Sequence, residues 1–205
     1  MSTRSTTEPA TDPATAPAID PATGPATDPA GAPVTGPATG PEAEEDGGVQ
    51  SRLPDLTRLF PELPKLSGAL RNALRNAPVP QAAINLSMLR GAQIVGSTYH
   101  AVSLTGVLRK AGETETRITA VATWQDAPFF TDSERVALKL TEAVLTPNPF
   151  GERVSDELFA EVAALYDEEA IWALALAIGQ LSLFVPIALI GKPIPGRPVG
   201  KNYSR

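Results

Sequence analysis

The chain has 205 residues, no cysteine and one histidine, so disulfides, thiolate metal sites and thiol redox chemistry are excluded. A multi-histidine metal site is equally ruled out, and we expect no metal and no other cofactor. The acidic excess lies in the first fifty residues, which hold eight acids and one base, whereas the remainder holds 15 acids and 16 bases. This near-neutral body gives no electrostatic reason to expect nucleic-acid binding.

A proline recurs every four residues from Pro9 to Pro41, with Ala, Thr, Asp and Gly between. Proline at this density blocks helix formation, and the segment has almost no large apolar side chains to bury. We therefore predict a disordered low-complexity tail over residues 1–50, either a solubilising spacer or a segment that docks a partner or accepts sugars. No apolar run follows Met1, so we expect no signal peptide and a cytoplasmic location.

The segment after the tail shows the spacing of helices. Leu66, Leu70 and Leu74 recur with helical period, and prolines follow them. Two further helices are predicted over 81–94 and 97–111. Gly96 lies between them and Gly112 follows the second, and a glycine suits the residue after a helix end.

Polar residues predict where the later helices begin. Thr131 and Glu134 have the spacing of a capping box. Thr114, Ser155 and Asp167 are placed to cap three more helices. No segment alternates with period two, so residues 51–200 are predicted to form one all-α domain with short connections.

Residues 170–191 contain no charged side chain. This uncharged segment is long enough to span a membrane. A basic C-terminal arm follows over 192–205, as in a membrane anchor with its positive end inside. Against a span, the segment includes Gly179, Gln180, Ser182 and Pro186. The alternative is a central helix buried on all sides. Such a helix needs cover from protein, so we expect a homo-oligomer in which the basic arm could lie across a neighbouring subunit.

Three stretches, 89–118, 120–145 and 154–184, resemble the carboxymuconolactone decarboxylase and alkylhydroperoxidase D-like superfamily, in particular its peroxidase-related branch. The middle stretch, with its Trp, Pro-Phe-Phe-Thr and Glu-Arg-x-Ala-Leu in order, is the most specific. The resemblance implies an all-α, alkylhydroperoxidase D-like helical bundle. It also implies assembly as a dimer, trimer or hexamer.

The resemblance fails where the family's chemistry would lie. The peroxidase branch has Cys-x-x-Cys-x-x-x-His at the start of this helix and a Glu about three turns earlier. The corresponding positions here are Ser97, His100, Leu104 and Asn85, so all four groups are replaced. A serine hydroxyl stays protonated near neutral pH and cannot store electrons as a disulfide, so the antioxidant thiol peroxidase activity is lost.

Ser97 and His100 lie one helical turn apart and could form a new catalytic pair. A hydrolase pair normally has a third group that orients the histidine, and the next positions on this face are Leu104 and Val107. The competing interpretation makes Ser97 an N-cap and His100 a partly buried residue with a backbone partner. Tyr99 between them is expected to pack.

The decarboxylase branch needs no cysteine, and it would need cationic or imidazole groups to stabilise an enolate. Arg90, Arg117 and His100 are the candidates, although the family histidine falls on Leu104. Whether any catalysis remains is therefore open at this point.

The leading interpretation is a cysteine-less pseudoenzyme acting as a binding, scaffold or partner subunit beside an active paralogue. The first alternative is a non-redox enzyme, decarboxylase-like or hydrolase-like, using His100 in a small apolar pocket. The second is a membrane-tethered protein anchored by 170–191. The candidate catalytic residues are Ser97 and His100, and the candidate binding residues are Asn85, Tyr99, Leu104 and Arg117.

Overall fold

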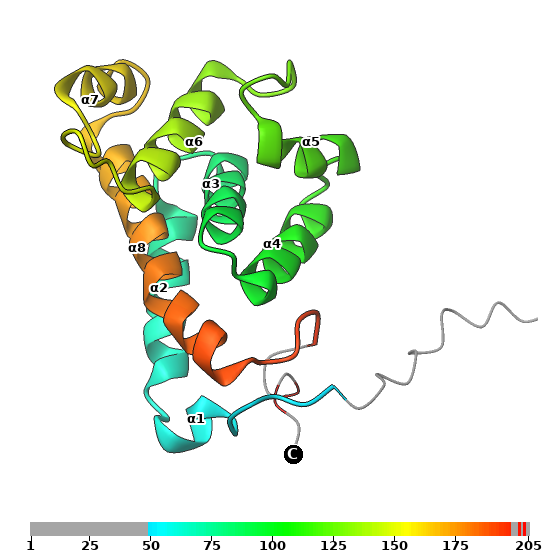
Figure 1. The fold of residues 1–205 in the computed structure, drawn as a ribbon. Coiled ribbons are helices and arrows are strands. Elements are labelled where there is room, and N and C mark those ends of the chain that lie inside the picture. The colour runs from blue at the N-terminus through cyan, green and yellow to red at the C-terminus, as the bar shows by residue number, and fades with distance from the viewer. Residues whose placement is uncertain (1–48, 198–200, 202, 204–205) are drawn as a thin grey trace, which may run out of the picture. The chain divides into compact units, whose positions relative to one another are not determined.

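The structure is a computed structural model that describes residues 49–197, 201 and 203. The predicted tail therefore lies outside the described residues except for its last two positions. The described part contains helices and no strand, as predicted (Figure 1). Its elements are α1 Leu56–Leu59, α2 Leu63–Asn76, α3 Gln81–Ile94, α4 Thr98–Lys110, α5 Glu115–Ala120, the 3₁₀ turn η1 Val121–Thr123, α6 Asp132–Leu145, α7 Asp156–Ala163 and α8 Glu168–Gly191.

The predicted helix boundaries are confirmed to within a residue for α3 and α4. Gly96, at φ 67°, ends α3, and Gly112, at φ 86°, ends α4. At α3, the Gly96 amide donates to the Gln93 carbonyl and the Ser97 amide to the Ala92 carbonyl, at 3.2 and 2.9 Å. This left-handed cap turns the chain within three residues, so α3 and α4 form a hairpin.

The predicted N-caps are also confirmed. The Thr131 hydroxyl accepts from the Glu134 amide, and the Glu134 carboxylate accepts from the Thr131 amide. Side chains of Thr114, Ser155 and Asp167 accept amide hydrogens at the starts of α5, α7 and α8. These contacts satisfy donors that the first turn of a helix leaves free.

Helix α3 is the centre of the domain. It packs against α4, α6 and α8, and Figure 1 shows it between them. Gly91 permits the closest approach, because a Cβ there would lie 2.5 Å from Leu181 Cδ2 and 2.9 Å from Leu145 Cδ1. Buried Leu86, Leu89 and other apolar side chains fill the spaces around it.

Helix α8 is buried on one face only, which corrects the prediction of a helix buried on all sides. Its inner face, with Leu174, Ile178 and Leu181, packs into the core. Its outer face exposes Trp172, Leu183 and other apolar residues. The single copy has too few elements to surround a 24-residue helix, and α8 has the length and composition of a membrane span.

The described part of the C-terminal arm packs on its own chain. Ile194 is buried. A Cβ built at Gly196 would lie 3.7 Å from Cγ1 of Val102 in α4, so this segment runs close to α4. The amides of Arg52 and Leu53 donate to the Gly191 carbonyl, which closes the end of α8. These are contacts within one copy, so the expectation that the arm lies across a neighbouring subunit stays a prediction.

Candidate functional site

The start of α4 brings together the two residues that the sequence analysis predicts at the family's cysteine positions. Ser97 Oγ and His100 Nδ1 lie 2.8 Å apart, within hydrogen-bonding distance. The left-handed cap at Gly96 fixes the Ser97 backbone, and one helical turn brings the His100 ring above it. Which of the two atoms donates depends on the histidine tautomer.

This geometry differs from both roles expected for an inert pair. Ser97 occupies the N-cap position, but its side chain makes no capping hydrogen bond to an α4 amide. His100 has the Ser97 side chain as its partner instead of a backbone group. The hydroxyl, on a residue only 2% exposed, is thus committed to the imidazole. The first-turn amides of α4 remain without a cap from Ser97 and can serve an external acceptor.

The surroundings of His100 favour the neutral form of its ring. Burial lowers the pKa of His100, because the charged imidazolium would lose hydration. The Tyr99 ring lies edge-on to it, with centroids 5.4 Å apart and planes at 89°. Within the described residues no carboxylate hydrogen-bonds to His100, so the orienting third group of a hydrolase triad has no counterpart there.

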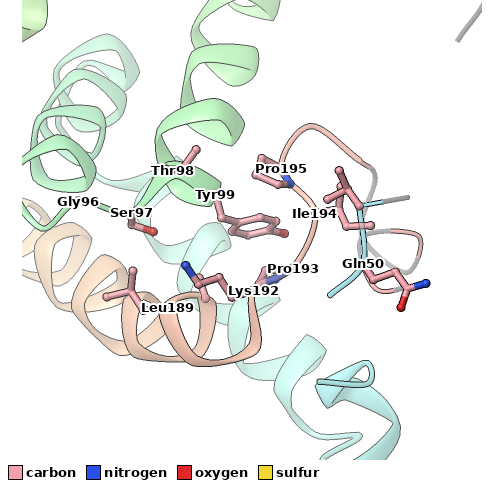
Figure 2. A pocket seen from close by; sticks show the side chains of 12 residues that line it. Gln50, Gly96, Ser97, Thr98, Tyr99, Leu189, Lys192, Pro193, Ile194 and Pro195 are labelled. Carbon is pink, nitrogen blue, oxygen red and sulfur yellow. The ribbon is translucent and has the colours of Figure 1, made fainter. Parts of the chain in front are cut away.

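A cavity of about 220 Å³ adjoins Ser97, whereas His100 is not among the residues that line it. Ser97 and Tyr99 line it from α4, Leu189 from the last turn of α8, and residues 192–195 from the following segment. Figure 2 shows the Tyr99 ring projecting from the start of α4 toward that segment. Lys192 contributes an ammonium group from a left-handed position at φ 51°. The cavity is apolar over most of its wall, with polar groups at the Ser97 and Lys192 sides.

Asn85 and Leu104 lie away from the cavity. Leu104 packs in the core with Leu108 and Ile118, so its side chain contributes to packing and does not reach the cavity. Asn85 is buried near the start of α3, where Gln81 Nε2 lies 3.5 Å from its Oδ1. Nine residues separate it from the end of α3, a rise of about 14 Å.

Arg117 is held in a cluster of its own. Its guanidinium donates to Glu113 at 2.8 Å, to Glu134 at 2.6 Å and to the Phe129 carbonyl. It also lies over the Phe130 ring, 5.2 Å from the centroid. The same Glu134 carboxylate closes the capping box of α6. Each of the three guanidinium nitrogens thus donates to a protein partner, and the cluster lies apart from the residues that line the cavity.

Arg90 belongs to a second cluster, centred on Glu142. The carboxylate accepts from Arg90 Nε at 2.7 Å, from Trp124 Nε1 at 2.8 Å and from Gln125 Nε2 at 3.1 Å. This set ties α3 and α6 to the turn after η1. The described residues hold no group of three His, Cys, Asp or Glu that could bind a metal ion.

Sequence reasoning missed the other wall of the cavity. Lys192, Pro193 and Ile194 reach the start of α4 only because α3 and α8 run side by side. Their basic and proline-rich composition was visible, but it carried no signal of this contact. Glu142 was also missed, since a lone acid in a helix resembles a solvated surface residue.

The fold and the site together define a cysteine-free protein whose described part is all-α and carries a serine–histidine contact at the start of α4. Residues 61–143 match the carboxymuconolactone decarboxylase family. The uncharacterised protein YdfG of Bacillus subtilis is 31% identical over 132 residues, which is 64% of this chain and 88% of YdfG. The chain belongs to the carboxymuconolactone decarboxylase family.

Other relatives agree with this membership. The uncharacterised protein YnjA of Escherichia coli is 35% identical over 77 residues, covering 38% of this chain and 40% of YnjA. A crystal structure from Agrobacterium tumefaciens, of a protein of unknown function linked by name to the antioxidant defence protein AhpD, matches with a TM-score of 0.65. It is 24% identical and covers 73% of this chain and 100% of its own.

The debrominase Bmp8, solved alone and with 2,3,4-tribromopyrrole, matches with a TM-score of 0.58. It is 19% identical, and the match covers 65% of this chain and 70% of Bmp8. At this identity the likeness concerns the fold, which is therefore the AhpD-like helical arrangement predicted from the sequence.

Proposed function

We propose that this protein is a non-redox binding protein that holds a small molecule in the cavity beside Ser97. The observation that carries the proposal is the place of Ser97: it lines a cavity of about 220 Å³, and its Oγ lies 2.8 Å from Nδ1 of His100, which is not among the lining residues. In this proposal the pair stands where the family has its dithiol, and without cysteine the chain has no thiol that could reduce a peroxide and then form a disulfide.

The cavity favours a compact, ring-sized ligand with an acceptor group. Its volume is below the ~300 Å³ at which sites for drug-sized ligands begin, whereas an apolar cavity of about 150 Å³ already holds benzene. Amides of the first turn of α4 and the Lys192 ammonium supply donors for a carboxylate or carbonyl. Bmp8, a protein of the same fold, has been solved with a small heteroaromatic ring, which supports this choice of ligand size.

The proposal is tested with benzoate as the probe, on the full chain. Benzoate at ten times its dissociation constant should stabilise the protein by about 1.4 kcal/mol, visible as a higher melting temperature. Lys192→Gln should remove most of this stabilisation, whereas Lys110→Gln, a control on the exposed end of α4, should not. Equal responses of both variants, or no binding of benzoate or of its neutral analogue benzamide, would contradict the proposal.

A redox assay tests the loss of the family activity separately. The full chain, given an organic hydroperoxide and a thiol donor, should consume no more peroxide than a heat-killed sample. Turnover that scales with the amount of protein would show that a group other than cysteine supplies electrons.

A second candidate function, a hydrolase, is favoured by the same 2.8 Å contact. If Nδ1 is unprotonated, it can take the proton as Ser97 Oγ attacks an ester carbonyl, and the α4 amides can stabilise the oxyanion. The acyl group on Ser97 would then be released by water. With p-nitrophenyl acetate, this candidate requires a burst of p-nitrophenolate that disappears in Ser97→Ala; no burst leaves the binding role.

A scaffold or partner-subunit role remains a variant of the same proposal, since a binding subunit need not catalyse. Pull-down with the full chain as bait would support it by recovering a cysteine-containing family member. Recovery of no such protein would leave the small-molecule role alone.

A further inference from the structure

The described part of the chain carries opposite charge at the two ends of α8. Where α8 begins, α7 and the first turn of α8 hold the acidic side chains of Asp156, Glu157, Glu161, Asp167, Glu168 and Glu169. Where α8 ends, the basic side chains are those of Arg52, Arg58, Lys65, Lys192, Arg197 and Lys201. Because α8 has 24 residues, its two ends lie about 36 Å apart, with α7 beside the first and α1 beside the second (Figure 1). We call the described residues of 50–65 and 189–203 the basal end.

Contacts between two distant segments hold the basal end together. The amides of Arg52 and Leu53 donate to the Gly191 carbonyl, at 2.9 and 3.2 Å. Tyr203 lies against the same residue, since a Cβ built at Gly191 would be 3.8 Å from its Cε1. The basic side chains that precede α2 and those that follow α8 are therefore gathered at one end of the bundle.

The two acidic side chains of the basal end do not cancel its positive charge. Glu62 pairs with Lys65 at 3.0 Å, and the Asp55 carboxylate accepts from the amide and the hydroxyl of Thr57, at 2.9 and 2.8 Å. Six basic side chains against these two acids leave an excess of four positive charges. Such a field attracts an anionic surface to the basal end and turns the acidic end, with α7, away from it.

An exposed apolar corner lies among these basic side chains. Leu59 is 65% exposed, Phe60 58% and Leu53 44%. Hydrogen bonds fix the turn that presents them, because the Phe60 amide donates to the Leu56 carbonyl at 2.9 Å and the Leu63 amide to the Phe60 carbonyl at 3.1 Å. A corner that is already held in one conformation loses little entropy when its side chains enter a partner.

An apolar corner surrounded by cations matches the surface of an anionic phospholipid bilayer. Leu59 and Phe60 can enter the boundary between headgroups and acyl chains, while the arginine and lysine side chains contact the phosphates. A nucleic acid would neutralise the same cations but leave the aliphatic side chains of Leu53 and Leu59 in water. A second copy of the basal end is disfavoured as the partner, because like charges would face each other.

We propose that the basal end docks this protein on the surface of an anionic phospholipid bilayer, with the side chains of Leu59 and Phe60 inserted. In this orientation α8 does not span the bilayer, and its outer face near Trp172 stays in water. The proposal does not depend on the ligand proposed for the cavity beside Ser97. Its tests therefore leave Lys192, which lines that cavity, unchanged.

Sedimentation with vesicles tests the docking on the full chain, prepared without detergent. Vesicles of phosphatidylglycerol and phosphatidylcholine in equal parts should carry the protein into the pellet at low ionic strength. Added salt should release it, because salt screens the charges. Vesicles of phosphatidylcholine alone should leave the protein in the supernatant. Equal binding to both kinds of vesicle, or binding to neither, would overturn the proposal.

Paired substitutions separate the apolar contribution from the electrostatic one. Phe60→Ala should weaken binding to the anionic vesicles at least about tenfold. Phe150→Ala is the matched control, since Phe150 is 97% exposed but lies in the loop between α6 and α7, and it should bind like the native chain. Arg58→Glu should also weaken binding at least about tenfold, whereas Lys110→Glu, at the exposed end of α4, should not. Loss of binding in Arg58→Glu but not in Phe60→Ala would mean that charge alone acts, as on a nucleic acid, and would overturn the proposal.

Tryptophan fluorescence tests which side of the molecule meets the lipid. The chain has two tryptophans: Trp124 is buried, and Trp172, 75% exposed, lies about 29 Å of helical rise from Gly191 at the end of α8. Binding to anionic vesicles should therefore leave the emission of the native chain unchanged. Phe60→Trp should add an emission that shifts to shorter wavelength on binding. A shift in the native chain, or none in Phe60→Trp, would place another face on the lipid and contradict the proposal.

Discussion

The two ends of α4 hold polar clusters of opposite character. After its C-terminus, Arg117 is enclosed by Glu113, Glu134 and a carbonyl, and the donors and acceptors are used within the protein. At its N-terminus, Ser97 and His100 share one neutral hydrogen bond beside a cavity. The first arrangement is complete without a ligand, whereas the second leaves helix amides and an ammonium group that a ligand can use. Whether the polar groups of a cluster already have hydrogen-bond partners within the protein therefore distinguishes a structural cluster from a candidate site better than the residue types do.

The largest effect is expected from breaking the saturated cluster with Arg117→Ala. The substitution leaves the carboxylate of Glu134, whose side chain is 9% exposed, without its cation. Loss of one partner of a buried ion pair costs about 3 kcal/mol, or roughly 10 °C in melting temperature for a domain of this size. Thermal unfolding followed by circular dichroism measures it. A change below about 2 °C would show that the cluster is solvated and that the comparison fails.

A smaller effect is expected at the other end of α4. Ser97→Ala and His100→Ala should each lower the free energy of unfolding by about 1 kcal/mol, because each removes one neutral hydrogen bond. The double variant should cost clearly less than the two single changes added together, since both remove the same bond. Chemical denaturation of the four proteins gives the coupling energy. Strict additivity would mean that the 2.8 Å contact contributes nothing to stability.

The pH dependence should be smaller still and confined to the histidine. Burial lowers the pKa of His100 below its ordinary value of 6.5, so the unfolded chain takes up the proton first as the pH falls. Stability is therefore complete above about pH 6.5 and declines as the pH falls from there toward the pKa of the folded state. Since His100 is the only histidine, His100→Gln should remove this decline below about pH 6.5. An identical decline in the variant would assign it to carboxylates.

The smallest effect is expected from Arg109→Ala. Arg109 and Glu115 form a close ion pair, with Nε and Oε1 2.5 Å apart, but their side chains are 57% and 62% exposed. Exposed pairs contribute little, because solvent screens them and ordering two long side chains costs entropy. The melting temperature should stay within error of the native protein. A loss comparable to that of Arg117→Ala would show that geometry alone, without burial, decides the strength of these clusters.

The helix ends of this chain were predictable because they are local. A hydroxyl or carboxylate oxygen that lies three residues before the amide that donates to it, as at Thr131 and Asp167, forms its hydrogen bond whatever the rest of the fold does. Glycines 96 and 112 act in the same way at the C-termini. The all-α class follows from these signals and from the apolar spacing between them.

The candidate site was predictable only in part. One helical turn places Ser97 beside His100, so their contact follows from the sequence alone. The partner of each side chain did not follow, since capping of α4 by Ser97 was equally compatible with the spacing. The role of Arg117 was also undetermined, because Glu134 lies 17 residues away and meets it only when α5 and α6 pack.

The sequence by itself thus determined the helices, their ends, the family and the loss of the thiol chemistry. Tertiary structure decided which polar groups are saturated, where a cavity remains and which face of α8 points outward. The physical reason is the sequence separation of the contacts. Helix caps and helical faces depend on neighbours within a few residues, whereas burial and ion pairing depend on elements brought together from distant parts of the chain. Lys192 and Ser97 illustrate it, since 95 residues apart they line the same cavity.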